Sequence, residues 1–226
     1  MVDGPDESSA AGHPHKRVNN RRSRFSYLRA SACIRGGLSS ACVTLSLVLI
    51  ASAAHAADIS FWISPCNNPQ TGCVEGDAQL ARWALDAWER VAGGRVHFVE
   101  ADRADAQFRM VWALRARGVY GETVPIEVNG VRGAQMNLRV EDGFTKDRLL
   151  HDTIVYLTCV HEAGHALGLG HTANFDDIMY SFQHGGDIDE YFGRYRRKLT
   201  VREDIRKYTG ISPPDRARLL ERLSQH

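Results

Sequence analysis

The stretch HEAGHALGLGH, from His161 to His171, constrains this chain more than any other part of it. On an α-helix, His161 and His165 lie one turn apart on the same face, so both imidazoles can reach one ion. Gly168 can take a positive φ at little steric cost, which ends the helix and lets His171 return as a third nitrogen ligand. Three neutral nitrogens leave the fourth tetrahedral position open to water, as in a catalytic zinc site. We therefore expect one zinc ion bound by His161, His165 and His171.

Glu162 directly follows the first expected ligand and can reach a metal-bound water without being a ligand itself. The pattern H-E-x-x-H-x-x-G-x-x-H fixes five positions, and a random match in a chain of this composition has odds on the order of one in ten thousand. The alternative is an ordinary helix with coincidental histidines. On the catalytic interpretation, Glu162 is the general base that takes a proton from the water.

A second motif follows at Asp177-Ile178-Met179-Tyr180, with Met179 eight positions after His171. The long histidine pattern followed by such a methionine is the signature of the metzincin metallopeptidases. Ile-Met-Tyr resembles the Met-turn of the matrixin branch, the group that includes the matrix metalloproteinases. The resemblance covers about residues 58–210 and is specific over 161–180. It implies an α+β catalytic domain with a five-stranded mixed twisted sheet, a long active-site helix and a Met-turn, with Met179 as an apolar floor below the ligands.

The resemblance implies a secreted zinc-dependent endopeptidase, in which Glu162 serves as general base for the water that attacks the peptide bond. Two alternatives stay open: a zinc-binding interaction module without peptidase activity, and an amidase that acts on cell-wall peptide. An extended peptide or protein substrate would pair with the edge strand expected at 119–128. The segment after Met179 would form the pocket for the side chain that follows the cleaved bond, with an expected lining of Tyr180, Phe182, Tyr191 and Tyr195.

Metals other than the catalytic zinc are not expected. Histidines and aspartates that bind structural zinc and calcium in matrixin sheet loops have no counterpart in RGAQMNLRVEDG, where Gln135 and Asn137 stand. Three further histidines lack ligand spacing and are expected to be structural or surface residues, namely His97, His151 and His184.

Residues 1–56 are expected to form an export signal. A basic region precedes the uncharged run ACVTLSLVLIASAA at 41–54, and Ala54-His55-Ala56 offers small residues to signal peptidase. Cleavage there would leave residues 57–226 as a single domain in the periplasm or outside the cell. The alternative is an uncleaved signal anchor, because residues 36–57 hold no Lys, Arg, Asp or Glu and could nearly span a bilayer.

The charge balance gives no reason to expect nucleic acid as a partner. The whole chain carries a formal charge of +1, and residues 1–56 hold seven basic against three acidic residues, which leaves the remainder at −3. A monomer is expected.

Cys66 and Cys73 bracket the turn-forming NNPQTG, and an exported protein would pair them in a disulfide, with two free thiols as the alternative. Cys159 is expected to be a buried apolar residue.

The hydrophobic periodicity predicts a mixed order of strands and helices. An amphipathic helix is expected over 75–91, an active-site helix from an N-cap at Asp152 to about Gly168, and two later helices, from a capping box at Thr200 to Gly210 and from Ser212 to Ser224. Asn129-Gly130 predicts a tight hairpin between the last two strands. The expected strands span 58–64, 95–100, 106–113, 119–128 and 131–140.

Overall fold

The computed structural model describes residues 56–114, 120–140 and 146–225. The elements below all belong to the unit spanning residues 51–226. The predicted export signal lies outside the described residues except for Ala56. No helix within the described ranges combines the length and hydropathy that crossing a membrane requires.

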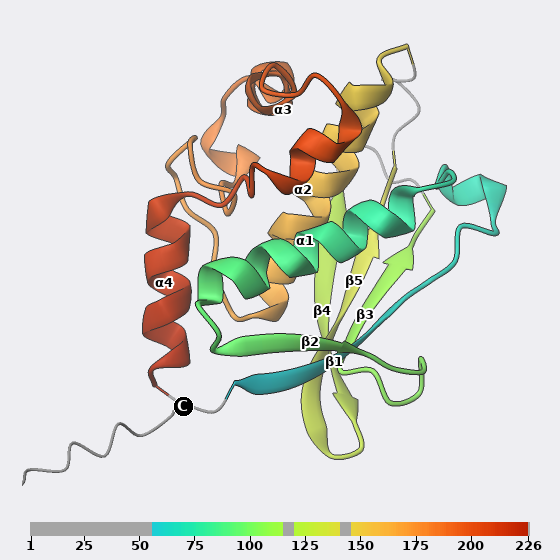
Figure 1. The fold of residues 1–226 in the computed structure, drawn as a ribbon, viewed down its shortest axis with the longest axis vertical. Helices are drawn as coiled ribbons and strands as arrows, with labels where there is room; N and C mark the ends of the chain where they lie inside the picture. Colours follow the sequence, from blue (N-terminus) through green and yellow to red (C-terminus); the bar gives the residue numbers. More distant parts are fainter. Residues whose placement is uncertain (1–55, 115–119, 141–145, 226) are drawn as a thin grey trace, which may run out of the picture. The chain divides into compact units, whose positions relative to one another are not determined.

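Five strands form one mixed sheet in the order β2-β1-β3-β5-β4 (Figure 1). The strand β1 pairs in parallel with β2 and β3, and β3 pairs in parallel with β5. Only β4 is antiparallel, and it forms one edge of the sheet beside β5. The sheet confirms the predicted fold class. The strands span Ala57–Ile63 (β1), Val96–Glu100 (β2), Phe108–Trp112 (β3), Gly121–Val128 (β4) and Val131–Leu138 (β5).

The turn between β4 and β5 has the predicted form. Asn129 and Gly130 have φ angles of 52° and 77°. Two successive positive φ values match the twist of a two-residue hairpin, and Asn-Gly is the dipeptide that adopts them at least cost. The hairpin fixes the register of β4 on β5 and so places the edge strand beside the active-site helix, which contacts both strands.

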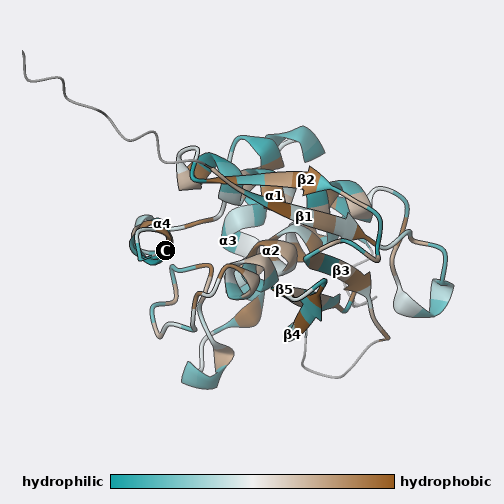
Figure 2. Cartoon of the chain, turned by 90° about the horizontal axis from the view of Figure 1, so that it is seen from below, coloured by the Kyte–Doolittle hydropathy of each residue, from teal (hydrophilic) through white to brown (hydrophobic). Residues whose placement is uncertain are grey.

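Two long helices, α1 (Asp77–Ala92) and α2 (Arg148–Ala166), pack against each other and against the sheet. The helix α1 contacts β1 and β2, and α2 contacts β4 and β5. Trp88 is fully buried between them, and its indole Nε1 donates to the carbonyl oxygen of Val160 at 2.8 Å. Figure 2 shows hydrophobic residues concentrated on β1, β2, β3 and α2, whereas α4 (Pro213–Leu223) is largely hydrophilic.

The active-site helix begins earlier than predicted. Its N-cap is Asp147, whose Oδ1 accepts from the backbone N–H of Leu150 at 3.2 Å, and not Asp152. Asp152 lies inside α2, is almost completely buried, and forms an ion pair with Arg148 at 3.0 Å. Both aspartates suit an N-cap by residue type. Residue type and local pattern alone therefore do not distinguish the two positions.

The segment after the Met-turn also differs from the prediction. A helix that was not predicted, α3, spans Ile188–Arg196, with Asp187 as its N-cap. The predicted helix from Thr200 to Gly210 is instead a short 3-10 helix, η4, over Arg202–Arg206. Asp204 accepts from the backbone N–H groups of Thr200 and Val201 at 2.8 and 3.0 Å, so Asp204 closes this turn and the predicted Thr200 capping box is absent.

The final helix α4 follows the prediction closely. Ser212 accepts from the N–H of Asp215 at 3.1 Å, and Pro213 occupies its first turn. Two short 3-10 helices complete the described elements, η1 over Pro69–Thr71 and η3 over Phe182–His184. The structure joins Cys66 to Cys73 in a disulfide that closes the loop containing η1. Cys159 is a fully buried free cysteine.

Candidate metal centre

The three histidines of the motif converge on one point. The Nε2 atom of His165 lies 3.1 Å from that of His161 and 3.0 Å from that of His171, and the remaining pair is 3.3 Å apart. Three nitrogens bound to one tetrahedral zinc at about 2.1 Å would lie roughly 3.4 Å from one another. The donor set and its spacing therefore fit a zinc ion with one position left for a further ligand.

Backbone carbonyl groups set the orientation of two of these rings. The Nδ1 of His161 donates to the carbonyl oxygen of Ile178 at 2.6 Å, and that of His165 donates to the carbonyl oxygen of Leu169 at 2.9 Å. A proton on Nδ1 leaves the Nε2 lone pair free for the metal. Burial lowers the pKa of His161 to about 4 and also lowers that of His171. The imidazoles of His161 and His171 are therefore neutral near pH 7, as metal ligands must be.

The glycine that follows the helix directs the third ligand toward the first two. Gly168 has a φ of 89°, a left-handed conformation that strains other residues. Beyond it, the N–H of Leu169 returns to the carbonyl oxygen of Gly164 at 2.9 Å, which closes the helix end. The chain after His171 is then tied to the Met-turn, because the N–H of Thr172 donates to the carbonyl oxygen of Met179 at 2.8 Å.

Met179 lies directly beneath the ligand-bearing turn of α2. It is fully buried, and a Cβ atom built on Gly164 would overlap with its Sδ. Gly164 stands between the two helical ligands, so the absent side chain is what lets Met179 pack against the helix at this point. The structure thus places Met179 where the family resemblance implied an apolar floor.

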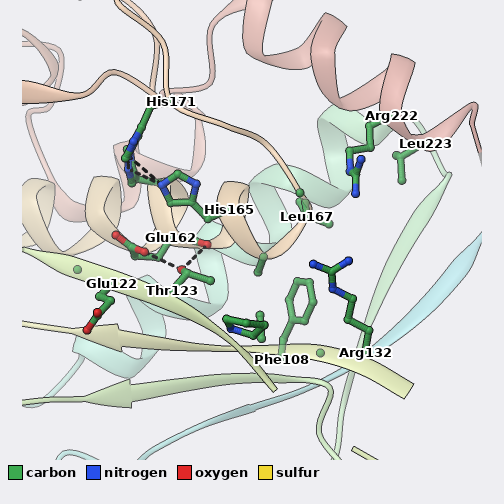
Figure 3. Close-up of a pocket in the computed structure, with 17 residues that line it drawn as sticks. Phe108, Glu122, Thr123, Arg132, Glu162, His165, Leu167, His171, Arg222 and Leu223 are labelled. Carbon is green, nitrogen blue, oxygen red and sulfur yellow. Dashed lines mark hydrogen bonds between the residues drawn. The ribbon is translucent and has the colours of Figure 1, made fainter. Parts of the chain in front are cut away.

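Glu162 lies between α2 and the edge strand β4 (Figure 3). Its Oε2 accepts from the Thr123 hydroxyl at 2.6 Å, and the same hydroxyl donates to its backbone carbonyl oxygen at 3.1 Å. A Cβ on Gly121 would overlap with Oε1, so β4 passes close to the carboxylate. Burial raises the pKa of Glu162. Thr123 and Gly121 were not singled out from the sequence, and no local pattern marks them.

A cleft of about 660 Å³ runs past the histidines along β4. Its walls come from β4, β5, the end of α2 and the end of α4. A second hollow of about 300 Å³ lies on the other side of His161 and Glu162. It includes the predicted Tyr180, Phe182 and Tyr191, together with residues that were not predicted, namely Tyr120, Leu157, Thr158, Ser181, Gln183 and Phe192.

Tyr195 does not line this hollow, and its assignment to the substrate pocket is wrong. Its hydroxyl donates to the carbonyl oxygen of Tyr208, and its ring lies 5.8 Å from that of Tyr156. Tyr191 and Tyr195 are one helical turn apart on α3. On α3, Tyr191 and Phe192 therefore reach the hollow, whereas Tyr195 packs into the core behind it.

The C-terminal helix supports the Met-turn. Asp215 Oδ2 accepts from the backbone N–H of Ile178 at 2.8 Å, and the hydroxyl of Ser212 donates to Asp177 at 2.7 Å. Arg218 bridges the two carboxylates of Asp177 and Asp215. The carbonyl of Ile178 in turn orients His161. Asp215 of α4 is thus linked to His161 through the backbone of a single residue, Ile178.

A second group of possible ligands lies near the start of α2 and consists of Asp77, His151 and Asp152, all buried. Arg148 reaches both carboxylates, at 3.7 Å for Asp77 and 3.0 Å for Asp152, and Arg202 lies 3.6 Å from Asp152. Two guanidinium groups already balance the two negative charges, so this cluster is a buried ion-pair network.

The remaining histidines lie outside the metal centre. His97 is exposed beside Asp58 at 3.2 Å, and His184 is exposed at the end of η3. Both positions suit the surface role expected of histidines without ligand spacing.

Comparisons with known proteins agree with this geometry. The family model described as Matrixin matches residues 55–191. Human matrix metalloproteinase-15 is 27% identical over 130 residues, which cover 50% of this chain and 19% of that protein. The chain therefore spans about a fifth of the length of this relative. The family match includes every predicted zinc ligand, Glu162 and Met179, and it ends before α4. From the match, the mixed sheet and the convergent histidines, the chain belongs to the matrixin family of metzincin metallopeptidases.

Proposed function

We propose that this protein is an exported, monomeric zinc endopeptidase that cleaves extended peptide segments. The observation that carries the proposal is the placement of Glu162. Its carboxylate is held by Thr123 beside three histidine nitrogens that lie 3.0 to 3.3 Å apart. A bound zinc ion at these nitrogens would acidify water and polarise a carbonyl group. A site that only bound metal would need no buried carboxylate next to its open position.

Glu162 performs the proton transfers in this mechanism. It accepts a proton from the attacking water and delivers that proton to the leaving nitrogen of the peptide. Its raised pKa supports both steps, because a carboxylate in a buried site holds a proton more readily than one in water. The hydroxyl of Thr123 fixes one carboxylate oxygen, which leaves the other for the water.

The edge of β4 positions the substrate. Among the described strands, β4 pairs with β5 alone, so its other edge can accept an extended peptide. Main-chain pairing along β4 would carry the scissile bond past Glu162. The 300 Å³ hollow on the far side would then receive the side chain that follows the cleaved bond. Its aromatic lining favours an apolar side chain there.

The decisive experiment separates metal binding from hydrolysis. Glu162→Ala should retain about one zinc per chain, measured by elemental analysis, and should lose roughly 10²- to 10⁴-fold in peptide cleavage. His165→Ala should lose the zinc itself, because it opens the ligand set. Glu203→Ala, which removes an exposed carboxylate far from the motif in sequence, is the matched control and should leave both readouts unchanged.

The purified exported form is tested against a peptide library and against cell-wall peptide, with and without a zinc chelator. Near wild-type cleavage by Glu162→Ala would remove the base assignment. Zinc binding without any cleavage by the wild type would favour an interaction module. Cleavage of cell-wall peptide alone would favour the amidase.

A further inference from the structure

The far end of the active-site cleft contains residues that the matched family region does not supply. The family match ends at residue 191, but Arg222 and Leu223 of α4 line the same cleft as the three histidines. Arg222 lies against the end of the active-site helix, since a Cβ on Gly168 would overlap with its Nε. The helix α4, which lies beyond the matched residues, therefore helps to form the cleft in addition to supporting the Met-turn.

A second arginine faces Arg222 across this end of the cleft. Arg132, at the start of β5, points into the same space from the opposite wall, with Phe108 and Leu167 nearby (Figure 3). Within the described part of the chain, no ion pair or side-chain hydrogen bond joins either arginine to another residue. Many other arginines there have acidic partners, including Arg82, Arg139, Arg194, Arg196, Arg197 and Arg218.

Two guanidinium groups beside one cleft create a site for an anion. Arginine binds carboxylates through two parallel N–H donors, and an apolar wall strengthens such a contact by excluding water. Apart from Glu162, the described lining of the cleft includes one carboxylate, Glu122, which is already paired with Arg139 at 3.2 Å. Glu127 stands opposite Arg132 on β4, but among the described residues no ion pair joins the two, so neither Arg132 nor Arg222 has an acidic partner within 4 Å.

The strand register places this site relative to the scissile bond. Thr123 marks the level of Glu162 on β4, and Arg132 pairs with Glu127, four residues farther along β4. At about 3.3 Å per residue, this offset is about 13 Å, or three to four residues of an extended peptide after allowing for the length of the arginine side chains. The site lies on the side of Glu162 away from the aromatic hollow, which corresponds to residues before the cleaved bond.

We propose that Arg132 and Arg222 form a specificity subsite for an aspartate or glutamate located three or four residues before the cleaved bond. The proposal rests on the proposed peptidase function and identifies the substrates as extended peptides with an acidic residue at that position. Because the groups are partly exposed, the attraction should weaken as salt is added.

The test uses quenched fluorescent peptides that differ only by Glu, Gln or Lys, scanned through each position on both sides of the bond. The wild type should cleave the Glu peptide with a kcat/KM about 10-fold above that of the Gln peptide, only three or four residues before the bond. Arg222→Glu and Arg132→Glu should each abolish this preference or turn it toward Lys. Lys198→Glu makes the same charge change at an exposed position that does not line the cleft and should preserve the preference.

Binding provides a readout that is independent of cleavage. Anisotropy of labelled Glu and Gln peptides on Glu162→Ala should show the same order of affinity and the same loss with Arg222→Glu. Equal kcat/KM for Glu and Gln at every position, or a preference that survives both arginine variants, would overturn the subsite. A wild type that cleaves no peptide would refute the proposed peptidase, and the binding comparison would still decide whether the arginines select acidic peptides.

Discussion

At the scale of single residues, the motif contains two glycines outside its fixed positions, and the structure gives them different roles. Gly164 has no room for a side chain, because Met179 lies against it and Trp88 is close by. Gly170 is exposed, and nothing lies within 4 Å of the place where its Cβ would be. Of these two glycines, Gly164 is required by close packing, whereas position 170 has room for a side chain.

Gly164→Ala should displace Met179 or bend the helix between the two ligands. Overpacking of this kind costs about 1–3 kcal/mol of unfolding free energy, and we expect weaker zinc binding because both helical ligands flank the site. Denaturant unfolding and a competitive zinc chelator measure the two effects. Gly170→Ala is the control and should change neither. Equal behaviour of the two variants would show that the contact with Met179 imposes no constraint.

At the scale of elements, α4 and the Met-turn form one unit. Asp215 is fully buried, holds the N–H of Ile178 and forms an ion pair with Arg218, while the carbonyl of Ile178 receives the proton-bearing nitrogen of His161. The last element of the chain thus stabilises the orientation of the first ligand. A residue that acts in this way positions the site and does not contact the substrate.

Asp215→Ala should leave the N–H of Ile178 without its acceptor and Arg218 with Asp177 as its remaining acidic partner. The expected results are a loss of roughly 1–3 kcal/mol in unfolding free energy and about 10-fold weaker zinc binding. Chelator competition measures the affinity. Glu221→Ala, on the exposed face of α4, serves as the control. If Asp215→Ala lost stability but kept full zinc affinity, the link from α4 to His161 would be structural only.

At the scale of the whole molecule, the proposed zinc site connects distant parts of the fold. The ligands belong to α2 and the loop that follows it, the carbonyl that orients His161 belongs to the Met-turn, and α4 holds that turn. Because an unfolded chain cannot bring these groups together, zinc bound here should stabilise the folded state as a whole.

With free zinc 1,000-fold above its dissociation constant, the stabilisation should be about 4 kcal/mol, and removal of zinc should lower the thermal midpoint by roughly 10 °C. Calorimetry with and without a chelator measures this shift. His165→Ala should abolish it, and His97→Ala, at an exposed histidine outside the site, should retain it. An unchanged midpoint on zinc removal from the wild type would contradict the coupling.

Features that depend on residues close together in the chain could be predicted from the sequence. Local geometry determines three of these features, so the sequence pattern predicted them. They are the ligand spacing of His161 and His165, the positive φ of Gly168 and the Asn129-Gly130 hairpin. The family resemblance implied the fold class and the location of Met179. Even local signals failed where two candidates competed, as Asp147 and Asp152 did for the start of α2.

Which distant residues come together at the site depends on how the helices and strands pack. Thr123 and Glu162 are 39 positions apart, and Ile178 and Asp215 are 37 apart. Tyr195 has the residue type of a pocket wall but lies one helical turn too far along α3. Arg132 and Arg222 face each other across the cleft, although no sequence pattern links them. Helical and strand periodicities are set by neighbouring residues, whereas contacts between elements depend on how their faces pack, which no short stretch of sequence encodes.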